Sequence, residues 1–171
     1  MYFIRKNKAF TLIELLVVIA IISILTAIVI ANLTQSKAKS RDAKRISDVA
    51  QIQLALELFF DRCNQYPVPL STSSANGCTN GITLGTFMTQ IPNPPRSSDP
   101  AYSAGYWVNS QSAPSNYLMK VTLEGTNSAL VDSYTGTLNS GGTYYQNGSP
   151  TTHNLIGGCS TASFEYCVLP K

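Results

Sequence analysis

A short basic start runs directly into an apolar segment in the stretch Lys8-Ala9-Phe10-Thr11-Leu12-Ile13-Glu14-Leu15-Leu16-Val17-Val18-Ile19-Ala20-Ile21-Ile22. The 22 residues from Leu15 to Ser36 carry no charge, and most of them are Leu, Ile, Val or Ala. A helix of about 20 apolar residues crosses a bilayer core of roughly 30 Å. The stretch therefore predicts a membrane-spanning helix.

Glu14 stands at the head of this apolar run. A carboxylate at the centre of a membrane helix costs on the order of 3 kcal/mol, so its position needs a physical reason. In the first turn of a helix, the positive end of the helix dipole stabilises an acid. The simplest interpretation is an interfacial Glu14 that the dipole stabilises.

The stretch from Lys8 to Ile22 closely resembles the processing and methylation signature of type IV prepilins and pseudopilins. The resemblance implies that residues 1–9 form a cytoplasmic leader, which a dedicated membrane peptidase removes between Ala9 and Phe10. It also implies N-methylation of the new amino group of Phe10. The family usually has Gly before the cut; Ala9 departs from that pattern but is also small.

A cut at this point gives Glu14 a second interpretation, as the partner of the new amino terminus. Phe10 and Glu14 are at i and i+4, so the pair could close within one chain. It could equally close between neighbouring chains and set their axial stagger, and the resemblance favours this intermolecular pair. The sequence leaves both pairings open.

Two other interpretations compete for the amino-terminal segment. A secretory signal peptide would be cut after Val29-Ile30-Ala31, although the apolar run exceeds the usual 7–15 residues of such peptides. A static single-pass adhesin or binding module would keep residues 1–9. The mature chain would start at Phe10, Met1 or Asn32 in the three cases.

Charge is sparse and uneven in this chain of 171 residues, 12% of which are charged. Removing residues 1–9 would leave nine basic and nine acidic side chains. This balance argues against a dedicated nucleic-acid binder, and no aromatic residue lies between the bases of residues 37–45 to stack on nucleotides. We expect no nucleic-acid partner.

The apolar run continues into a charged segment, with no Pro or Gly between Phe10 and Cys63. One helical face is apolar, while charged and amide side chains occupy the others; the apolar residues are Ile46, Val49, Ile52, Leu56 and Phe59. Tyr66-Pro67 indicates that the helix has ended. We expect one helix with a membrane half (residues 10–34) and an amphipathic half (residues 35–63).

Basic residues cluster from Lys37 to Arg45. We interpret them as a solvated helix face at the membrane surface, partly compensated by Asp42 and Asp48 and attracted to acidic lipid headgroups. Five bases on this flank exceed the three before the anchor, and a plain positive-inside count would keep the head in the cytoplasm. The leader resemblance and the four cysteines outweigh that count and predict an extracytoplasmic head.

Residues 64–171 are rich in Ser, Thr, Asn, Gly and Tyr and predict a β-rich head. Strands are expected at Tyr106–Asn109 and Tyr117–Glu124, joined as a hairpin by Gln111–Ser115, and at Phe164–Leu169. The face of Tyr117, Met119, Val121 and Leu123 should pack on the long helix. Leu84–Gln90 suggests a short helix or turn, and Asn139–Pro150 suggests an exposed loop.

Four cysteines form an even set without the C-x-x-C spacing of a metal or redox site, so an exported head would hold disulfides. The local pairs Cys63–Cys78 and Cys159–Cys167 are favoured over the two crossed alternatives. Catalysis and metals have little support. His153 is the single histidine, and Asp132 has only Ser133, Asn139 and Asn147 as weak companions for a hard cation. We predict no enzyme, no cofactor and no metal.

The predicted fold class is α+β, with a long amino-terminal helix packed on a small antiparallel sheet. The resemblance implies a structural subunit of a type IV pilus or a type II secretion pseudopilus, and leaves open which of the two. Its implied partners are further copies of the chain, a prepilin peptidase and methyltransferase, an assembly platform with its ATPase, and the bilayer. Its implied location is the cytoplasmic membrane, followed by the filament.

Overall fold

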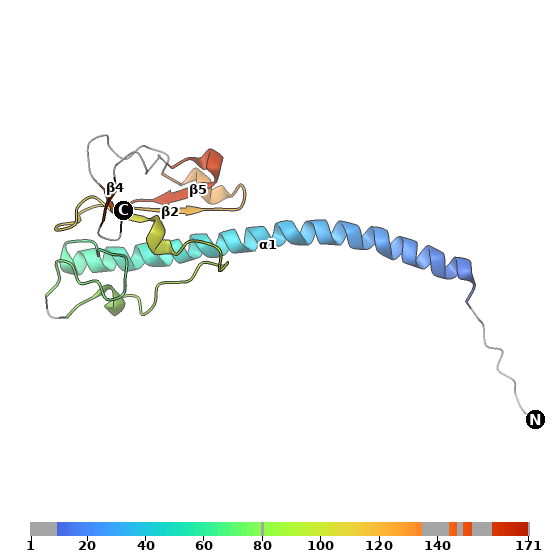
Figure 1. Ribbon diagram of the computed structural model, residues 1–171, viewed down its shortest axis with the longest axis horizontal. Helices are drawn as coiled ribbons and strands as arrows, with labels where there is room; N and C mark the ends of the chain where they lie inside the picture. Colours follow the sequence, from blue (N-terminus) through green and yellow to red (C-terminus); the bar gives the residue numbers. More distant parts are fainter. Residues whose placement is uncertain (1–9, 80, 135–143, 147–148, 152–158, 171) are drawn as a thin grey trace, which may run out of the picture. The chain divides into compact units, whose positions relative to one another are not determined.

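The computed structural model of the chain describes residues 10–79, 81–134, 144–146, 149–151 and 159–170. Two compact units divide the chain, Met1–Ala38 and Lys39–Lys171, and the helix α1 (Leu12–Cys63) contributes to both (Figure 1). The predicted α+β fold, a long amino-terminal helix with a small antiparallel sheet, is confirmed.

Helix α1 is uninterrupted and ends at a recognisable cap. It contains neither Pro nor Gly, so no residue interrupts its backbone hydrogen bonds. At its end Asn64 adopts a left-handed conformation with φ 54°, and its N–H donates to the carbonyl of Phe60 at 2.7 Å. This is the αL cap that terminates many helices, and Pro67 follows shortly after it.

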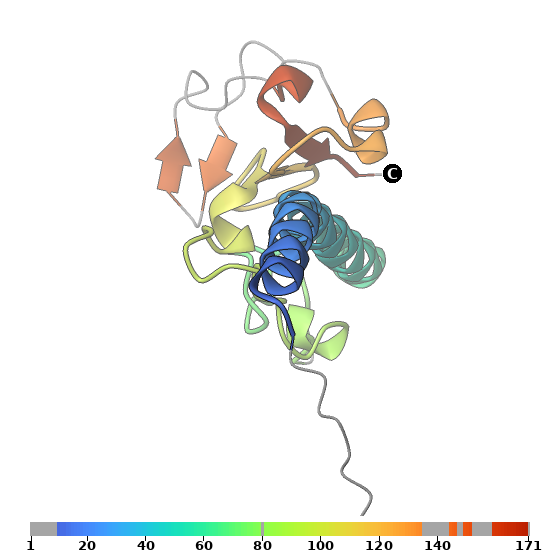
Figure 2. The same cartoon turned by 90° about the vertical axis from the view of Figure 1, so that its right-hand side faces the viewer.

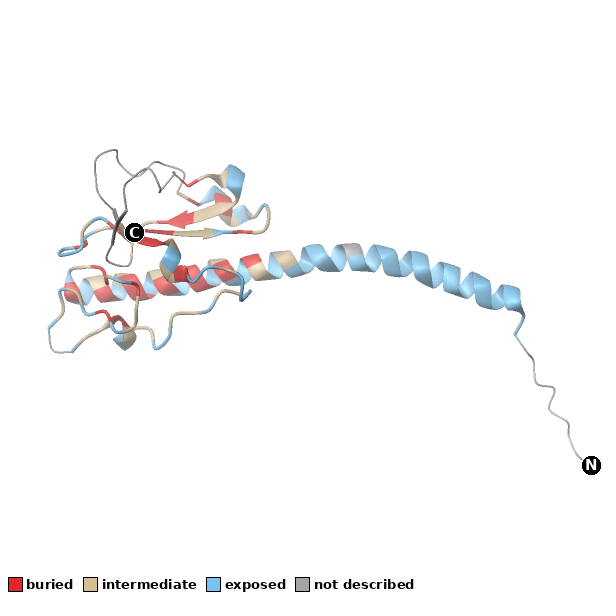
Figure 3. Ribbon diagram, viewed as in Figure 1, coloured by how far each residue is buried: buried red, intermediate tan, exposed pale blue. Residues whose placement is uncertain are grey.

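From Leu12 to Lys37 the described side chains of α1 are exposed (Figure 3). Four hydroxyls of this region donate to the carbonyl four residues earlier: Ser23, Thr26, Thr34 and Ser36, at 2.7–3.3 Å. These hydroxyls therefore bond within the helix itself.

In the second unit, α1 supplies one wall of the hydrophobic core. Val49, Ile52, Leu56 and Phe59 are fully buried, as their spacing predicted, and Ile46 is half-buried. Within this unit the helix lies between the sheet and the segment that follows Cys63 (Figure 2). Leu70 is buried in the same core, and so is Leu84, which begins η1 (Leu84–Thr86).

Within the described residues the sheet has five strands in the order β4-β3-β1-β2-β5, and neighbouring strands are all antiparallel. The three predicted strands are present with slightly shorter bounds, as β1 (Tyr106–Val108), β2 (Tyr117–Thr122) and β5 (Glu165–Val168). β1 and β2 form the predicted hairpin, with Trp107 opposite Leu118. The connection is tied by Asn109 Oδ1, which accepts the N–H groups of Ser115 and Asn116.

Alternation along β2 divides its side chains between two clusters. Tyr117, Met119 and Val121 pack with the core on α1, as predicted. Leu123, the fourth residue predicted for this face, follows β2 and is buried outside that cluster. Leu118 faces the other way and packs in a second cluster with Trp107, Cys159 and Cys167. A strand between two apolar layers fixes its own register, because a slip of one residue would exchange the two faces.

The prediction of an irregular loop at Asn139–Pro150 was wrong for part of that range. β3 (Tyr144–Gln146) and β4 (Ser149–Thr151) pair with each other, and Tyr145 lies opposite Val108 of β1. Tyrosine favours a pleated surface, and pairing with β1 outweighs the Gly and Ser composition of the region. Residues 139–143 and 147–148 lie outside the described residues.

Both disulfides join cysteines that are near in sequence. Cys63–Cys78 connects the end of α1 to the following loop across 15 residues. Cys159–Cys167 connects β5 to the segment before η5 (Thr161–Ser163) across eight residues. These are the local pairs that the sequence favoured.

Candidate functional site

The first turn of α1 is built around Thr11 and Glu14. Glu14 Oε2 accepts hydrogen bonds from the backbone N–H and the hydroxyl of Thr11, both at 2.8 Å. The Glu14 N–H donates to Thr11 Oγ1 at 3.3 Å. This reciprocal arrangement is a capping box, which satisfies two backbone donors that a helix start otherwise leaves unpaired.

Sequence reasoning missed Thr11. It attributed the position of Glu14 to the helix dipole and to a pair with Phe10, whereas the structure brings Glu14 and Thr11 together. The signal was present as Thr11-Leu12-Ile13-Glu14, the Ser/Thr-x-x-Glu pattern of a capping box before an apolar run. Among the described residues, Glu14 Oε1 has no hydrogen-bond partner, so this oxygen is available to another group.

The surface beside this first turn is apolar and open. Phe10 precedes the helix with its side chain 86% exposed. The large apolar residues from Leu12 to Leu33 are also exposed in the isolated chain. By length and composition α1 is able to cross a membrane. An 18-residue part of it has a mean hydropathy of 3.0, and none of that part is buried against the rest of the described chain. Such a surface needs lipid or other helices around it.

The predicted cleavage bond joins Ala9 to Phe10. Ala9 and the remainder of residues 1–9 lie outside the described residues, whereas Phe10 is described and lies two residues before the start of α1. Cleavage and N-methylation at Phe10 therefore stay predictions.

A buried ionic cluster lies in the second unit, where α1 meets the end of β2. Arg45 is only 3% exposed and pairs with Asp42 and Asp99, each at 2.6 Å, and with Glu124 at 2.9 Å. Burial alone would lower the pKa of Arg45, but hydrogen bonds to Asp99 and Glu124 outweigh it and raise that pKa. A buried guanidinium with three carboxylates fixes the geometry of the elements that carry them.

Glu124 connects this cluster to two further arginines. Arg41 binds its carboxylate in a two-pronged contact at 2.5 and 2.6 Å, and Arg96 binds it at 2.7 Å. These interactions lower the pKa of Glu124 to about 2, chiefly through the hydrogen bond from Arg41. The Glu124 N–H also donates to Asp42 Oδ1 at 2.9 Å, so α1 and the end of β2 are joined through main chain as well.

A second buried acid of α1, Asp48, accepts hydrogen bonds from Lys44 at 2.9 Å and from the Tyr102 hydroxyl at 2.7 Å. Tyr102 begins η2 (Tyr102–Gly105), and its burial, together with Asp48, raises the pKa of the phenol well above its usual value. This contact ties η2 to the helix.

The interpretation of residues 37–45 as one solvated face was therefore wrong for part of the cluster. Arg45, Asp42 and Asp48 are buried, and Arg41 is half-buried against Glu124. Only Lys37, Lys39 and Lys44 of the five bases remain exposed. The ion-pair partners Asp99 and Glu124 are 54 and 79 residues from Arg45 in sequence, so periodicity along the helix could not identify them.

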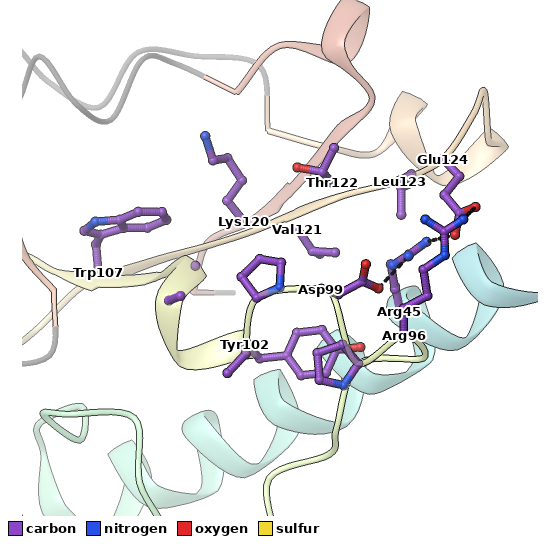
Figure 4. Close-up of a pocket in the computed structure, with 15 residues that line it drawn as sticks. Arg45, Arg96, Asp99, Tyr102, Trp107, Lys120, Val121, Thr122, Leu123 and Glu124 are labelled. Carbon is purple, nitrogen blue, oxygen red and sulfur yellow. Dashed lines mark hydrogen bonds and ion pairs between the residues drawn. The ribbon is translucent and has the colours of Figure 1, made fainter. Parts of the chain in front are cut away.

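A pocket of about 340 Å³ lies beside this ionic cluster, between the segment Pro94–Gly105 and β2 (Figure 4). The paired side chains of Arg45, Asp99 and Glu124 lie at one end, and Trp107 and Lys120 at the other. Lys120 Nζ pairs with Glu165 at 3.0 Å and lies 6.0 Å from the centre of the Trp107 ring. The remaining lining is largely apolar.

Within the part of the chain that the structure describes, no group of three or more His, Cys, Asp or Glu side chains has the arrangement of a metal site. Asp132 is exposed at the end of η3 (Ser128–Val131), while Ser133 is buried and bonds to β5 through the carbonyl of Glu165 and the N–H of Cys167. His153, Asn139 and Asn147 lie outside the described residues.

The amino-terminal segment matches a known family model. Residues 4–30 fit the prokaryotic N-terminal methylation motif. These residues contain the Ala9–Phe10 bond, the capping box and most of the apolar run. The predicted resemblance to type IV prepilins and pseudopilins is thus confirmed for this amino-terminal segment.

Curated relatives point to the same class. The chain is 38% identical over 63 residues to type II secretion system core protein G of Aeromonas hydrophila, which covers 37% of this chain and 44% of the relative. It is 29% identical over 104 residues to the core protein G of Vibrio cholerae, covering 57% and 71%. It is also 38% identical over 61 residues to the type IV major pilin protein PilA of Myxococcus xanthus, covering 36% and 28%. No solved structure gives a significant match.

Proposed function

We propose that this chain is the structural subunit of an extracytoplasmic filament, inserted in the membrane through α1, cleaved before Phe10 and assembled through the same helix. The observation that carries the proposal is the methylation motif over residues 4–30, which coincides with a capped, acid-headed apolar helix. The role is mechanical, and the relatives support a structural subunit rather than an enzyme.

Between the two filament types, we favour a type II secretion pseudopilus. The alignments that cover more than half of this chain are to core protein G, whereas the match to the pilin covers 36%. The peptidase, the methyltransferase, the assembly platform and its ATPase follow from this assignment as partners. The inner membrane is the site of insertion, with the head outside the cytoplasm.

The chemistry of assembly is proposed to centre on Glu14. Thr11 holds Oε2, so the carboxylate is already oriented when the leader is removed. Oε1 would then accept a hydrogen bond from the new amino group of Phe10 of a neighbouring chain. A charge pair in lipid is strong because no water competes for it, and it forms only at one stagger of the two helices. The apolar surface of α1 exchanges lipid for neighbouring helices at the same time.

The amino-terminal residue of the mature protein tests the proposal. The full chain is expressed with a prepilin peptidase, recovered from the membrane fraction and sequenced from its amino terminus. We expect N-methylated Phe10. A chain that keeps Met1 would indicate a static anchored module, and a soluble chain that starts at Asn32 would indicate a secreted protein; either result would overturn the proposal.

Glu14 provides the matched test of assembly. Glu14→Gln keeps the size of the side chain but removes its charge, and it should leave cleavage intact while filaments sheared from the cells fall at least ~10-fold, the factor that corresponds to about 1.4 kcal/mol. Glu14→Asp, which keeps the charge, is the control and should retain part of the assembly. Filaments at the wild-type level from Glu14→Gln would contradict the charge-pair mechanism.

A further inference from the structure

The pocket beside β2 is held open by interactions on both of its sides. Arg45 binds Asp99 of the segment Pro94–Gly105 and Glu124 after β2, so it ties both walls to α1. At the opposite end of the pocket, Gly105 contacts the backbone of β2. A Cβ on Gly105 would lie only 2.0 Å from the carbonyl oxygen of Lys120. The walls cannot close on the space without breaking buried ion pairs.

The interior of this pocket suits an apolar group rather than an ion. Its charged lining residues already have partners, since Arg45, Arg96, Asp99 and Glu124 pair among themselves and Lys120 pairs with Glu165. An ion inside the pocket would lose its hydration without gaining an unpaired counter-charge there, because the remaining donors of Arg96 lie at the exposed rim. The surfaces that remain are those of residues such as Pro94, Pro100 and Val121.

Val131 is an apolar side chain without a partner of its own. It ends η3 and is 86% exposed, and among the described residues that follow α1 no other large apolar side chain is exposed. The turn that carries it is fixed, because Asn127 caps η3 through the Ala129 N–H and Leu130 is buried beneath it. Val131 does not line the pocket of its own chain.

Charge at the two places is complementary. The exposed Asp132 follows Val131 directly. Arg96, at the rim of the pocket, is 45% exposed, and its pair with Glu124 uses only one of its nitrogen atoms. A guanidinium has five N–H donors, so Arg96 is able to bind a second carboxylate.

We infer that the pocket between Pro94–Gly105 and β2 receives Val131 of a second copy of this chain, with Asp132 of that copy beside Arg96. The inference rests on the proposed function and adds to it a contact between heads. Val131 and the pocket are different surfaces, so a head-to-tail contact between them would repeat from copy to copy, and it would build an open filament where the rotation between copies does not close a ring. It would add a second determinant of stagger to the charge pair of the helices.

Paired cysteines test this contact in the full chain. Val131→Cys is combined with Thr122→Cys, an exposed residue of the pocket lining, in cells that assemble filaments. Oxidised filaments should give a ladder of covalent oligomers on a non-reducing gel. The control combines Val131→Cys with Ala113→Cys, an exposed position outside the pocket, and should remain monomeric.

A second variant does not depend on cross-linking. Val131→Asp should lower the filament yield at least ~10-fold, whereas Val131→Ile keeps the apolar knob and should assemble as the wild type does. The docking of Val131 would be overturned if the Val131→Cys/Thr122→Cys chain formed normal filaments without covalent oligomers, or if Val131→Asp assembled normally. Either result would leave the filament role intact. A wild-type chain that forms no filaments would instead refute the proposed function itself.

Discussion

The two halves of helix α1 use one backbone for opposite purposes. From Leu12 to Leu33 the large apolar side chains are exposed, and the hydroxyls of Ser23 and Thr26 bond to their own helix. From Lys39 to Cys63 the helix carries charges, yet Arg45 and Asp42 are buried and pair with each other. Arg45 also pairs with Asp99 and Glu124 of the head. Among the described residues the large apolar side chains of the apolar half are exposed, whereas one face of the charged half is buried against the head. From hydropathy alone, one would expect the apolar half to be buried and the charged half to be exposed.

The largest effect should come from breaking the ionic cluster of the charged half. Arg45→Ala leaves the buried Asp42 and the half-buried Asp99 and Glu124 around a missing cation, and it should cost roughly 3–5 kcal/mol of unfolding free energy. Denaturation of the full chain in detergent micelles, followed through the fluorescence of Trp107, measures this cost; Trp107 is the only tryptophan and lies in the head. Lys39→Ala, at an exposed position, is the control and should change little. A similar stability for Arg45→Ala would refute the role of the cluster.

The next contrast lies within a single turn of the charged half. Leu56 is fully buried and Leu54 is 62% exposed. Leu56→Ala should lose about 2–5 kcal/mol through the cavity it leaves, while Leu54→Ala should change stability by less than about 0.5 kcal/mol. The same denaturation experiment measures both. Equal losses would mean that the exposed face of this half has a partner that the isolated chain does not reveal.

Acid should weaken the charged half in a defined pH window. Because the pKa of Glu124 is lowered to about 2, this carboxylate stabilises the folded head fully above its unfolded value of about 4.5. That contribution is lost as the pH falls from there through 2. Glu124→Gln should remove this part of the acid dependence, seen in thermal unfolding from pH 5 to pH 2. An unchanged pH profile in that variant would contradict the assignment.

The smallest effect should come from the start of the apolar half. Thr11→Val removes the hydroxyl of the capping box and should weaken the first turn by about 1 kcal/mol, with roughly fivefold faster hydrogen exchange at the Glu14 amide. Thr11→Ser keeps the hydroxyl and should exchange as the wild type does. Exchange spectra of the full chain in micelles decide the matter. Equal rates in all three chains would show that the box does not stabilise this turn.

Features with a local or periodic signal were predictable from the sequence. The helix was expected from Phe10 to Cys63 and runs from Leu12 to Cys63, and the hairpin of β1 and β2 was expected with its inward face. Those predictions depended on composition and on periods of 3.6 and 2 residues, which a single segment displays.

Features that depend on distant partners were not predictable in this way. The burial of Arg45 requires Asp99 and Glu124, and the strand at Tyr144–Gln146 depends on its pairing with Val108 of β1. The capping box at Thr11 is different, because its pattern was visible in the sequence and was overlooked. Long-range electrostatics therefore limited the prediction of the head, and incomplete use of helix capping rules limited that of the site.

The hydroxyls of the apolar half have a consequence for how neighbouring helices recognise one another. Ser23, Thr26, Thr34 and Ser36 each donate to a carbonyl of their own helix. The described surface therefore offers an adjacent helix shape and dispersion, but little directional bonding from these groups. The interaction energy of two such helices would change little as one shifts along the other. The charge pair of Glu14 would then fix their stagger. A subunit would therefore move from lipid into a filament without breaking the hydrogen bonds of these four hydroxyls.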